Sequence, residues 1–189
     1  MAHLLQQLYD YLDGQQLWHS TLVLKRGDHL LRAGATDTNV YYLEEGTLHY
    51  YLLLEDEAQE VRFGYAGDFV VALDSFLVGR PSSLYAQALR KTTVRVLPQS
   101  VCFARIKEDP AFNQLWQQIM HWMVLGQLER EIDLLTNDTA ERYRRVLERS
   151  PRLFQEIPAK YIANYLRMTP ETLSRCKSAA LAPGLRHKG

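Results

Sequence analysis

The chain has 189 residues, 47% of them apolar and 23% charged, which is enough for one large core or for a core with a small satellite domain, and which excludes a disordered chain. No apolar run approaches the roughly 18 to 20 residues of a membrane span, and Asp10 and Asp13 stand where a secretion signal would be apolar. Cys102 and Cys176 are far apart and form no CxxC pair, so we expect no disulfide framework or cysteine-rich metal site, and a soluble, cytoplasmic protein without a membrane partner.

Residues 19–97 contain short runs rich in Val, Leu, Tyr and Thr, separated by turns that contain Gly and Asp. This spacing predicts an antiparallel sandwich or jelly roll. The candidate strands are residues 21–24, 30–31, 40–43, 47–54, 60–63, 69–72, 84–89 and 94–96.

After Pro98 the hydrophobic period lengthens to that of helices, and Pro110 begins a long one. Several of its apolar positions follow a spacing close to that of a coiled coil, and those expected at a dimer interface are Leu115, Ile119, Trp122, Gly126 and Ile132. Because this helix is apolar on several sides, we expect it to pack on the sandwich and on a second copy of itself. A hinge at residues 136–138 then leads into a helix capped by Asp138.

Residues 157–177 contain two short amphipathic patterns around a tight break. Ile162, Ala163 and Leu166 share one face of the first pattern. Thr169 is expected to cap a second helix that begins at Pro170 and returns Leu173 to the same core. The start of the second helix would then point its polar side chains outward, as the reading helix of a helix-turn-helix does. An ordinary helical hairpin with a solvated face is the alternative.

The formal net charge of zero hides an asymmetry between the two ends of the chain. Residues 1–137 have 11 Lys and Arg against 17 Asp and Glu, a balance of −6, whereas residues 138–189 have 11 against 5, a balance of +6. Neutralised phosphates release counterions, so the arginine-rich block predicts affinity for a polyanion; it contains Arg142, Arg144, Arg145, Arg149 and Arg152. A mixed-charge surface helix is the competing interpretation. Because the helix-turn-helix pattern lies in the same segment, we favour nucleic acid.

The order of these parts resembles the CRP/FNR family of bacterial transcription regulators, over nearly the whole chain. Residues 24–51 are similar to the family's paired glycine turns and glycine hairpin, and residues 67–89, GDFVVALDSFLVGRPSSLYAQAL, are similar to its phosphate-binding cassette. The resemblance implies an α+β fold with a jelly-roll sensor domain at 1–109, a dimerisation helix at 110–137 and a helix-turn-helix domain at 138–189. It implies a homodimeric transcriptional regulator whose partners are double-stranded DNA, a second copy and RNA polymerase.

The same resemblance places an effector pocket at the cassette. Its candidate residues are Gly67, Val71, Ala72, Ser82 and Ser83, joined by Tyr85, which could line a cavity. In members that bind cAMP, a Gly-Glu pair holds the ribose and an Arg-Ser pair holds the cyclic phosphate. Here those positions read Val71-Ala72 and Ser82-Ser83, so the carboxylate and the guanidinium are missing. Arg80 is expected to be a surface turn residue. We therefore expect no cofactor and no cAMP binding in the family manner, and an effector of unknown identity stays open.

On the second helix of the motif, the resemblance implies that Glu171 accepts from a cytosine amino group and that Arg175 reads guanine. Thr169, Thr172 and Lys177 are the expected phosphate contacts. Arg167 occupies the turn position that is usually Gly, where a positive φ costs about 1 kcal/mol. Residues 178–181 could finish the helix, and residues 182–189 are too few for the β-hairpin wing that much of the family carries.

Two other function classes remain. A ligand-binding regulatory module would explain the sandwich but not the basic helical end of the chain. A jelly-roll enzyme would need clustered His and Glu ligands or a nucleophile beside a base, and the six histidines stand singly, so we expect neither catalysis nor a metal.

Overall fold

The computed structural model describes residues 2–181. Contacts divide the chain into two compact units, with the boundary between Val124 and Leu125. This boundary lies inside the longest helix, α4 (Pro110–Leu135).

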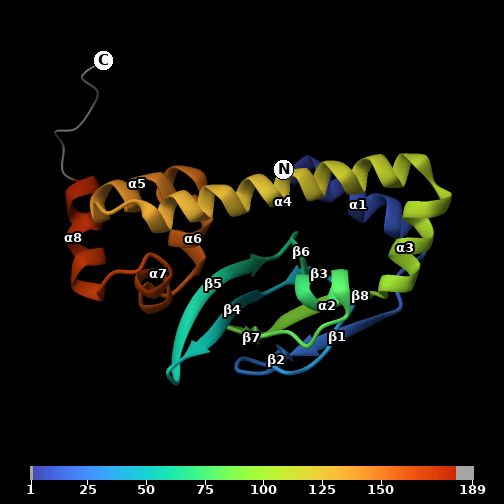
Figure 1. Ribbon diagram of the computed structural model, residues 1–189, viewed down its shortest axis with the longest axis horizontal. Coiled ribbons are helices and arrows are strands. Elements are labelled where there is room, and N and C mark those ends of the chain that lie inside the picture. The colour runs from blue at the N-terminus through green and yellow to red at the C-terminus, as the bar shows by residue number, and fades with distance from the viewer. Residues whose placement is uncertain (1, 182–189) are drawn as a thin grey trace, which may run out of the picture. The chain divides into compact units, whose positions relative to one another are not determined.

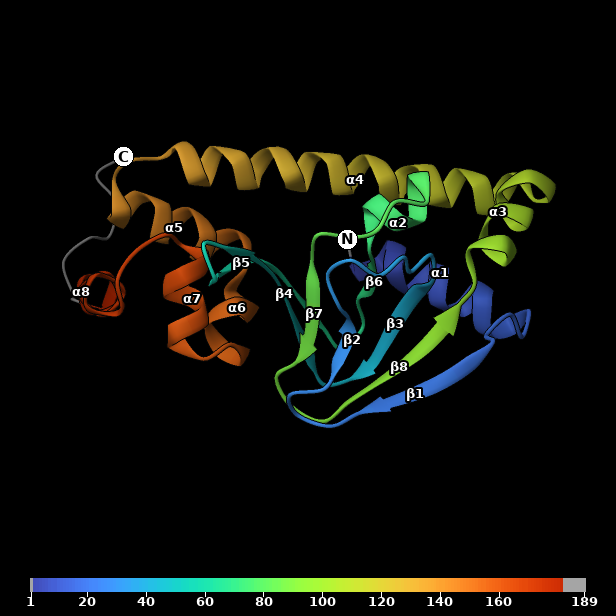
Figure 2. The same cartoon turned by 60° about the horizontal axis from the view of Figure 1, so that its bottom comes forward.

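The first unit contains a sandwich of two antiparallel four-stranded sheets (Figures 1 and 2). One sheet has the order β1 (Ser20–Leu24), β8 (Thr92–Leu97), β3 (Val40–Glu45), β6 (Phe69–Val71). The other has the order β2 (His29–Leu31), β7 (Tyr85–Ala88), β4 (Thr47–Leu54), β5 (Glu57–Tyr65). The predicted antiparallel fold is confirmed, with strand ends that differ by up to three residues.

The interior of the sandwich is filled by alternate apolar side chains from both sheets, among them Leu43, Leu48, Ala86 and Val94. The β3–β4 hairpin approaches β8 closely at Gly46, which has φ +97°. A Cβ there would lie 2.5 Å from the Thr92 Cα, so the hairpin requires glycine on steric as well as conformational grounds.

A second core in the same unit joins the sandwich to helices. It is formed by α1 (Ala2–Gly14), α2 (Leu73–Val78), α3 (Gln99–Glu108) and the first turns of α4, with Leu8, Leu12, Phe76 and Phe112 almost fully buried. The strand pattern did not predict α1 or α2. Both are short helices whose apolar side chains are buried in this second core.

The predicted start of α4 at Pro110 is confirmed, and Asp109 caps it. The Asp109 Oδ1 accepts hydrogen bonds from the backbone N–H groups of Ala111 at 2.9 Å and Phe112 at 3.2 Å. Its Oδ2 accepts from the Tyr11 hydroxyl of α1 at 2.7 Å. The hydrogen bond from Tyr11, followed by that from the Phe112 N–H, lowers the pKa of the Asp109 carboxyl.

The second unit is helical and includes the last turns of α4 together with α5 (Thr139–Arg149), α6 (Pro151–Glu156), α7 (Ala159–Tyr165) and α8 (Pro170–Leu181). Asp138 caps α5 by accepting from Ala140 and Glu141, as expected. The core of this unit is built from side chains of α5 to α8 and the links between them, and it contains Tyr143, Val146, Leu153, Ile157, Ile162, Ala163, Leu166, Leu173 and Cys176.

No helix among residues 2–181 combines the length and the apolar character that a bilayer span requires.

Candidate nucleic-acid interface

The turn between α7 and α8 has the geometry of a Schellman C-cap. The Met168 N–H donates to the Ala163 carbonyl at 3.0 Å, and the Arg167 N–H donates to the Asn164 carbonyl at 3.0 Å. Arg167 therefore takes the left-handed position, with φ +53°. The positive φ expected at this position is confirmed, although the chain has an arginine there, at a cost of about 1 kcal/mol relative to glycine.

The first residue after this turn region caps α8. The Thr169 Oγ1 accepts from the Thr172 N–H at 3.2 Å, and the Thr169 carbonyl accepts from the Leu173 N–H at 3.0 Å. Thr169 is thus the N-cap and Pro170 the first helical residue, as predicted. Helices α7 and α8 run at a steep angle to each other (Figure 2).

The two sides of α8 differ sharply in burial. Leu173 is 1% exposed, Ile162 and Leu166 are fully buried, and α7 contacts α8, so the predicted burial of all three side chains is confirmed. Glu171 and Arg175 are exposed, whereas Thr172 and Lys177 are half-buried. The structure thus brings four of the five predicted contact residues to the first two turns of α8 and its cap, with Lys177 farther along the helix. Residues 182–189, the tail considered for phosphate contacts, lie outside the described residues.

The polar side chains on this outer side interact with one another through hydrogen bonds and charge. Hydrogen bonds from its own backbone N–H and from the Thr169 hydroxyl, followed by the Arg175 charge, lower the pKa of the Glu171 carboxyl. The Arg175 Nη2 donates to the Thr172 Oγ1 at 3.1 Å. A guanidinium has five N–H donors, so Arg175 keeps a pair of them for another acceptor.

The arginine-rich block does not form the open basic surface that the charge pattern suggested. On α5, Arg144 pairs with Glu141 at 2.7 Å and Glu148 at 2.8 Å, and Arg142 is buried. Arg152 pairs with Glu156 at 2.6 Å.

The remaining two arginines of the block pair with carboxylates of α4. The Arg145 Nη2 lies 2.9 Å from the Glu129 Oε2, and the Arg145 Nε lies 3.2 Å from the Asp133 Oδ1. Arg149 pairs with the same two carboxylates. The competing interpretation, a mixed-charge surface helix, is the better description of α5, because three of its four arginines pair with carboxylates and the fourth, Arg142, is buried.

The sequence interpretation missed the role of Glu129 and Asp133. A signal for it was present, since two carboxylates four residues apart on one helix match two arginines four residues apart on the next. The sequence could not show that these two pairs face each other.

The prediction of the dimer interface is corrected at two of its five residues. Ile119 is 5% exposed and belongs to the second core of the first unit, and Leu115 is partly buried against that core, so neither presents much surface to a partner. Trp122 and Ile132 are exposed, and Gly126 is half-buried. The physical reason is that the periodicity fixes the spacing of a helical stripe but not which side of the helix faces outward.

The cassette residues lie where β6, α2 and β7 succeed one another. Ala72 is buried next to Val71, and Gly67 takes a turn conformation with φ +91°. Ser82 is 1% exposed and its hydroxyl accepts from the Leu84 N–H at 3.2 Å. Its backbone is bonded to the turn at Gly34 and Ala35.

Two cassette residues, Ser83 and Tyr85, are poorly placed for an anionic ligand. The Ser83 N–H donates to the Asp74 Oδ2 at 3.3 Å, so a carboxylate occupies this amide. Tyr85 alternates with Ala86, whose side chain is in the sandwich interior, and its ring stacks on Tyr51 with centroids 5.0 Å apart. The Tyr85 ring is therefore on the other face of β7, away from Ala72 in the sandwich interior. Arg80 is exposed, as expected.

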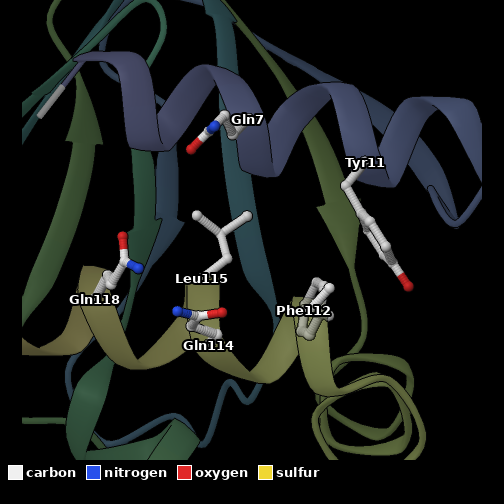
Figure 3. Close-up of a pocket in the computed structure, with 7 residues that line it drawn as sticks. Gln7, Tyr11, Phe112, Gln114, Leu115 and Gln118 are labelled. Carbon is white, nitrogen blue, oxygen red and sulfur yellow. The ribbon is translucent and has the colours of Figure 1, made fainter.

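A shallow hollow of about 300 Å³ lies between α1 and the first turns of α4 (Figure 3). Tyr11 and Phe112 approach each other at one end of it, with ring centroids 5.0 Å apart. The rest of its lining is Gln7, Ala111, Gln114, Leu115 and Gln118. None of the predicted effector residues lines it, and its side chains are uncharged, so it offers no cationic partner for a phosphate.

Metal ligation finds no support among residues 2–181, where no group of three or more His, Cys, Asp or Glu side chains is arranged around a common point. His49 is a satisfied histidine. Its Nδ1 lies 3.1 Å from the Glu60 carboxylate and its Nε2 lies 3.1 Å from the Gln87 Oε1.

Comparison with known proteins agrees with a sandwich domain followed by a helical unit. Residues 21–109 match the family model described as the cyclic nucleotide-binding domain. The fumarate and nitrate reduction regulatory protein of Vibrio cholerae is 27% identical over 164 residues, which cover 80% of this chain and 65% of that protein. Its counterpart from Klebsiella oxytoca is 28% identical over the same shares. The chain thus matches slightly less than two thirds of the length of these relatives.

Solved structures show the same fold. FixK2 from Bradyrhizobium japonicum superimposes with a TM-score of 0.72 and 22% identity over 90% of this chain and 88% of that one. A transcriptional regulator of the CRP/FNR family from Thermus thermophilus gives a TM-score of 0.64 and 18% identity over 90% of each chain.

Proposed function

We propose that this chain is a member of the CRP/FNR family and acts as a homodimeric regulator that binds double-stranded DNA through α8. One observation carries the proposal. The capped start of α8 presents Glu171, Thr172 and Arg175 on its outer side while Leu173 fixes the inner side in a core. An ionised carboxylate and a guanidinium one turn apart suit a cytosine amino group and a guanine edge, and the helix N-terminus favours a phosphate.

A homodimer is supported by a row of exposed apolar side chains on the end of α4, which we call the seam. Leu125, Leu128, Ile132 and Leu135 follow the alternating three- and four-residue steps of a coiled coil and are 60%, 51%, 37% and 72% exposed. In the sequence the same spacing continues back through polar residues, His121, Gln118 and Gln114. Because Leu115 and Ile119 are covered by the first unit, we propose the seam as the dimer interface in place of the stripe that includes them.

Two-fold pairing along α4 would give each dimer two copies of α8. Such a dimer contacts two half-sites about 34 Å apart, one turn of the duplex, so the preferred site should be nearly palindromic. Within this scheme we retain the division into a sensor domain at 1–109, a dimerisation helix at 110–137 and a DNA-binding domain at 138–189. RNA polymerase is a proposed partner on the family resemblance alone.

For the sensor domain we propose that cAMP is not bound in the family manner. The cassette has neither the guanidinium nor the carboxylate that would hold the cyclic phosphate and the ribose. The Asp74 carboxylate also occupies the Ser83 amide, where it would repel a phosphate. An effector, if the protein has one, would need a chemistry other than that of a cyclic nucleotide phosphate.

The test is to incubate the protein with a pool of random duplexes and to sequence the bound fraction over several rounds. Enrichment of a near-palindromic motif is expected. Recovery of all sequences in equal proportion, with no shift of a labelled duplex at low salt, would favour the alternative of a ligand-binding module that does not bind DNA.

A further inference from the structure

The last turns of α4 contain a polar cluster that faces the other helices of the second unit. The Asp133 carboxylate is fully buried and accepts hydrogen bonds from both Arg145 and Arg149 of α5. Glu129, one turn earlier, pairs with the same two guanidinium groups at 2.9 Å and 3.8 Å. Removing the carboxylate or one of its two cationic partners would strongly destabilise this unit, because an unpaired charge would then stay buried.

Arg130 extends this cluster to the helix-turn-helix. It is 9% exposed, and its Nη2 donates to the backbone carbonyl of Tyr165 at 2.6 Å. Its guanidinium carbon lies 3.6 Å from the centroid of the Tyr165 ring. Tyr165 is the last residue of α7, where carbonyl groups lack helical partners and the helix dipole is negative. The left-handed turn at Arg167, which sets the direction of α8, follows two residues later.

The residues of α4 that contact α5 and α7 lie on one side of the helix, and the seam lies on another side. Glu129, Arg130 and Asp133 recur at helical spacing; Arg130 and Asp133 are buried, and the half-buried Glu129 borders them. The four seam residues recur at the same spacing on a different side of the helix and are exposed. Residues 125–135 therefore form a two-sided segment, with polar contacts to α5 and α7 on one side and an apolar stripe on the other.

We infer that residues 125–135 are a clamp that positions the helix-turn-helix, with Arg130 and Asp133 as its positioning residues. This inference rests on the proposed function, in which the seam pairs two copies and α8 binds DNA. The placement of each α8 is then set directly by how the two copies of α4 pair. The loop at 136–138, which the sequence suggested as the hinge, lies within the clamped unit, since the unit boundary falls before Leu125. Gly126, whose helix propensity is about 1 kcal/mol poorer than that of alanine, adjoins that boundary.

The test uses full-length protein and four variants. Asp133→Asn keeps the shape of the side chain but removes its charge, and its matched control is Glu131→Gln, an exposed carboxylate on the same helix. Arg130→Met keeps the stem and loses the donors, whereas Arg130→Lys keeps a cation and a donor. Three quantities are measured for each protein, namely the dimer dissociation constant by sedimentation, amide exchange across α7 and α8, and the affinity for a selected duplex.

We expect Asp133→Asn and Arg130→Met to keep the dimer constant within about twofold. Both should speed amide exchange at the α7–α8 turn and weaken binding to the selected duplex by at least about tenfold. Arg130→Lys should fall between Arg130→Met and the wild type, and Glu131→Gln should behave as the wild type.

Wild-type exchange and wild-type duplex affinity in Asp133→Asn and Arg130→Met would overturn the clamp. So would a parallel loss of dimer and DNA affinity, because residues 125–135 would then act only in pairing. If Asp133→Asn unfolds the second unit, Arg130→Lys decides, since a loss of duplex affinity with an intact helical signal supports the clamp and an unchanged affinity contradicts it. If the wild type selects no duplex, the proposed function fails, and the exchange measurement still tests the clamp independently.

Discussion

Replacing Leu128 by alanine tests the seam of α4 in isolation from DNA. Leu128 is 51% exposed, and complete burial of a leucine side chain contributes about 1.5–3 kcal/mol, so its exposed half can contribute about 1 kcal/mol per copy. Two copies meet in a dimer, which gives about 2 kcal/mol and a dissociation constant raised about 30-fold. Alanine is the better helix former, so the substitution does not weaken α4 itself.

Sedimentation equilibrium over a range of protein concentrations measures this constant directly. Leu134→Ala is the matched control, because Leu134 is 41% exposed on the same helix but lies off the seam. Its dimer constant should stay within about twofold of the wild type. Equal weakening by both substitutions, or no weakening by Leu128→Ala, would refute the assignment of the seam.

Three further outcomes follow from local geometry. Thr169→Ala removes the cap of α8 and should lower the free energy of unfolding of the second unit by about 1 kcal/mol, measured by urea unfolding with circular dichroism; an unchanged value would mean that the cap contributes nothing. Arg167→Gly relieves the positive φ and should raise the same quantity by up to about 1 kcal/mol, a lower value being contrary to the reasoning. The pKa of Asp109 is lowered in the folded state, so its contribution is present above the unfolded pKa and is lost as pH falls below about 4; Asp109→Asn should lower the melting temperature at neutral pH and flatten its fall in acid, and an unchanged acid profile would contradict this.

The sequence predicted those parts of the fold that depend on neighbouring residues. The caps at Asp138 and Thr169 and the start of α4 at Pro110 follow from short-range chemistry, so their positions were correct. Alternation along the strands predicted the sandwich for the same reason. Helix α2 was missed because its six residues form a helix only where Phe76 can be buried in the second core, a long-range contact.

The candidate site was predictable on α8 but not on α4 and α5. Leu173 must return to the core shared with Ile162, and that requirement alone turns Glu171 and Arg175 outward. On α4, the stripe through Ile119 and the stripe through Leu128 have the same period, and only the packing of α1 shows which one is buried. Charge counts along the sequence predict a basic surface on α5, because they do not show that Asp133 lies against Arg145 and Arg149.

The central claim, that the start of α8 reads DNA, is tested most directly by comparing Arg175→Ala with Arg144→Ala on two duplexes. Arg144 is an exposed arginine of the same unit whose charge is paired with Glu141 and Glu148. Fluorescence anisotropy at fixed salt gives the affinity for the selected site and for a scrambled one. Arg175→Ala should weaken binding to the selected site by about 1–3 kcal/mol and change binding to the scrambled site far less, while Arg144→Ala changes neither. Equal losses on both duplexes, or equal effects of the two substitutions, would contradict the claim.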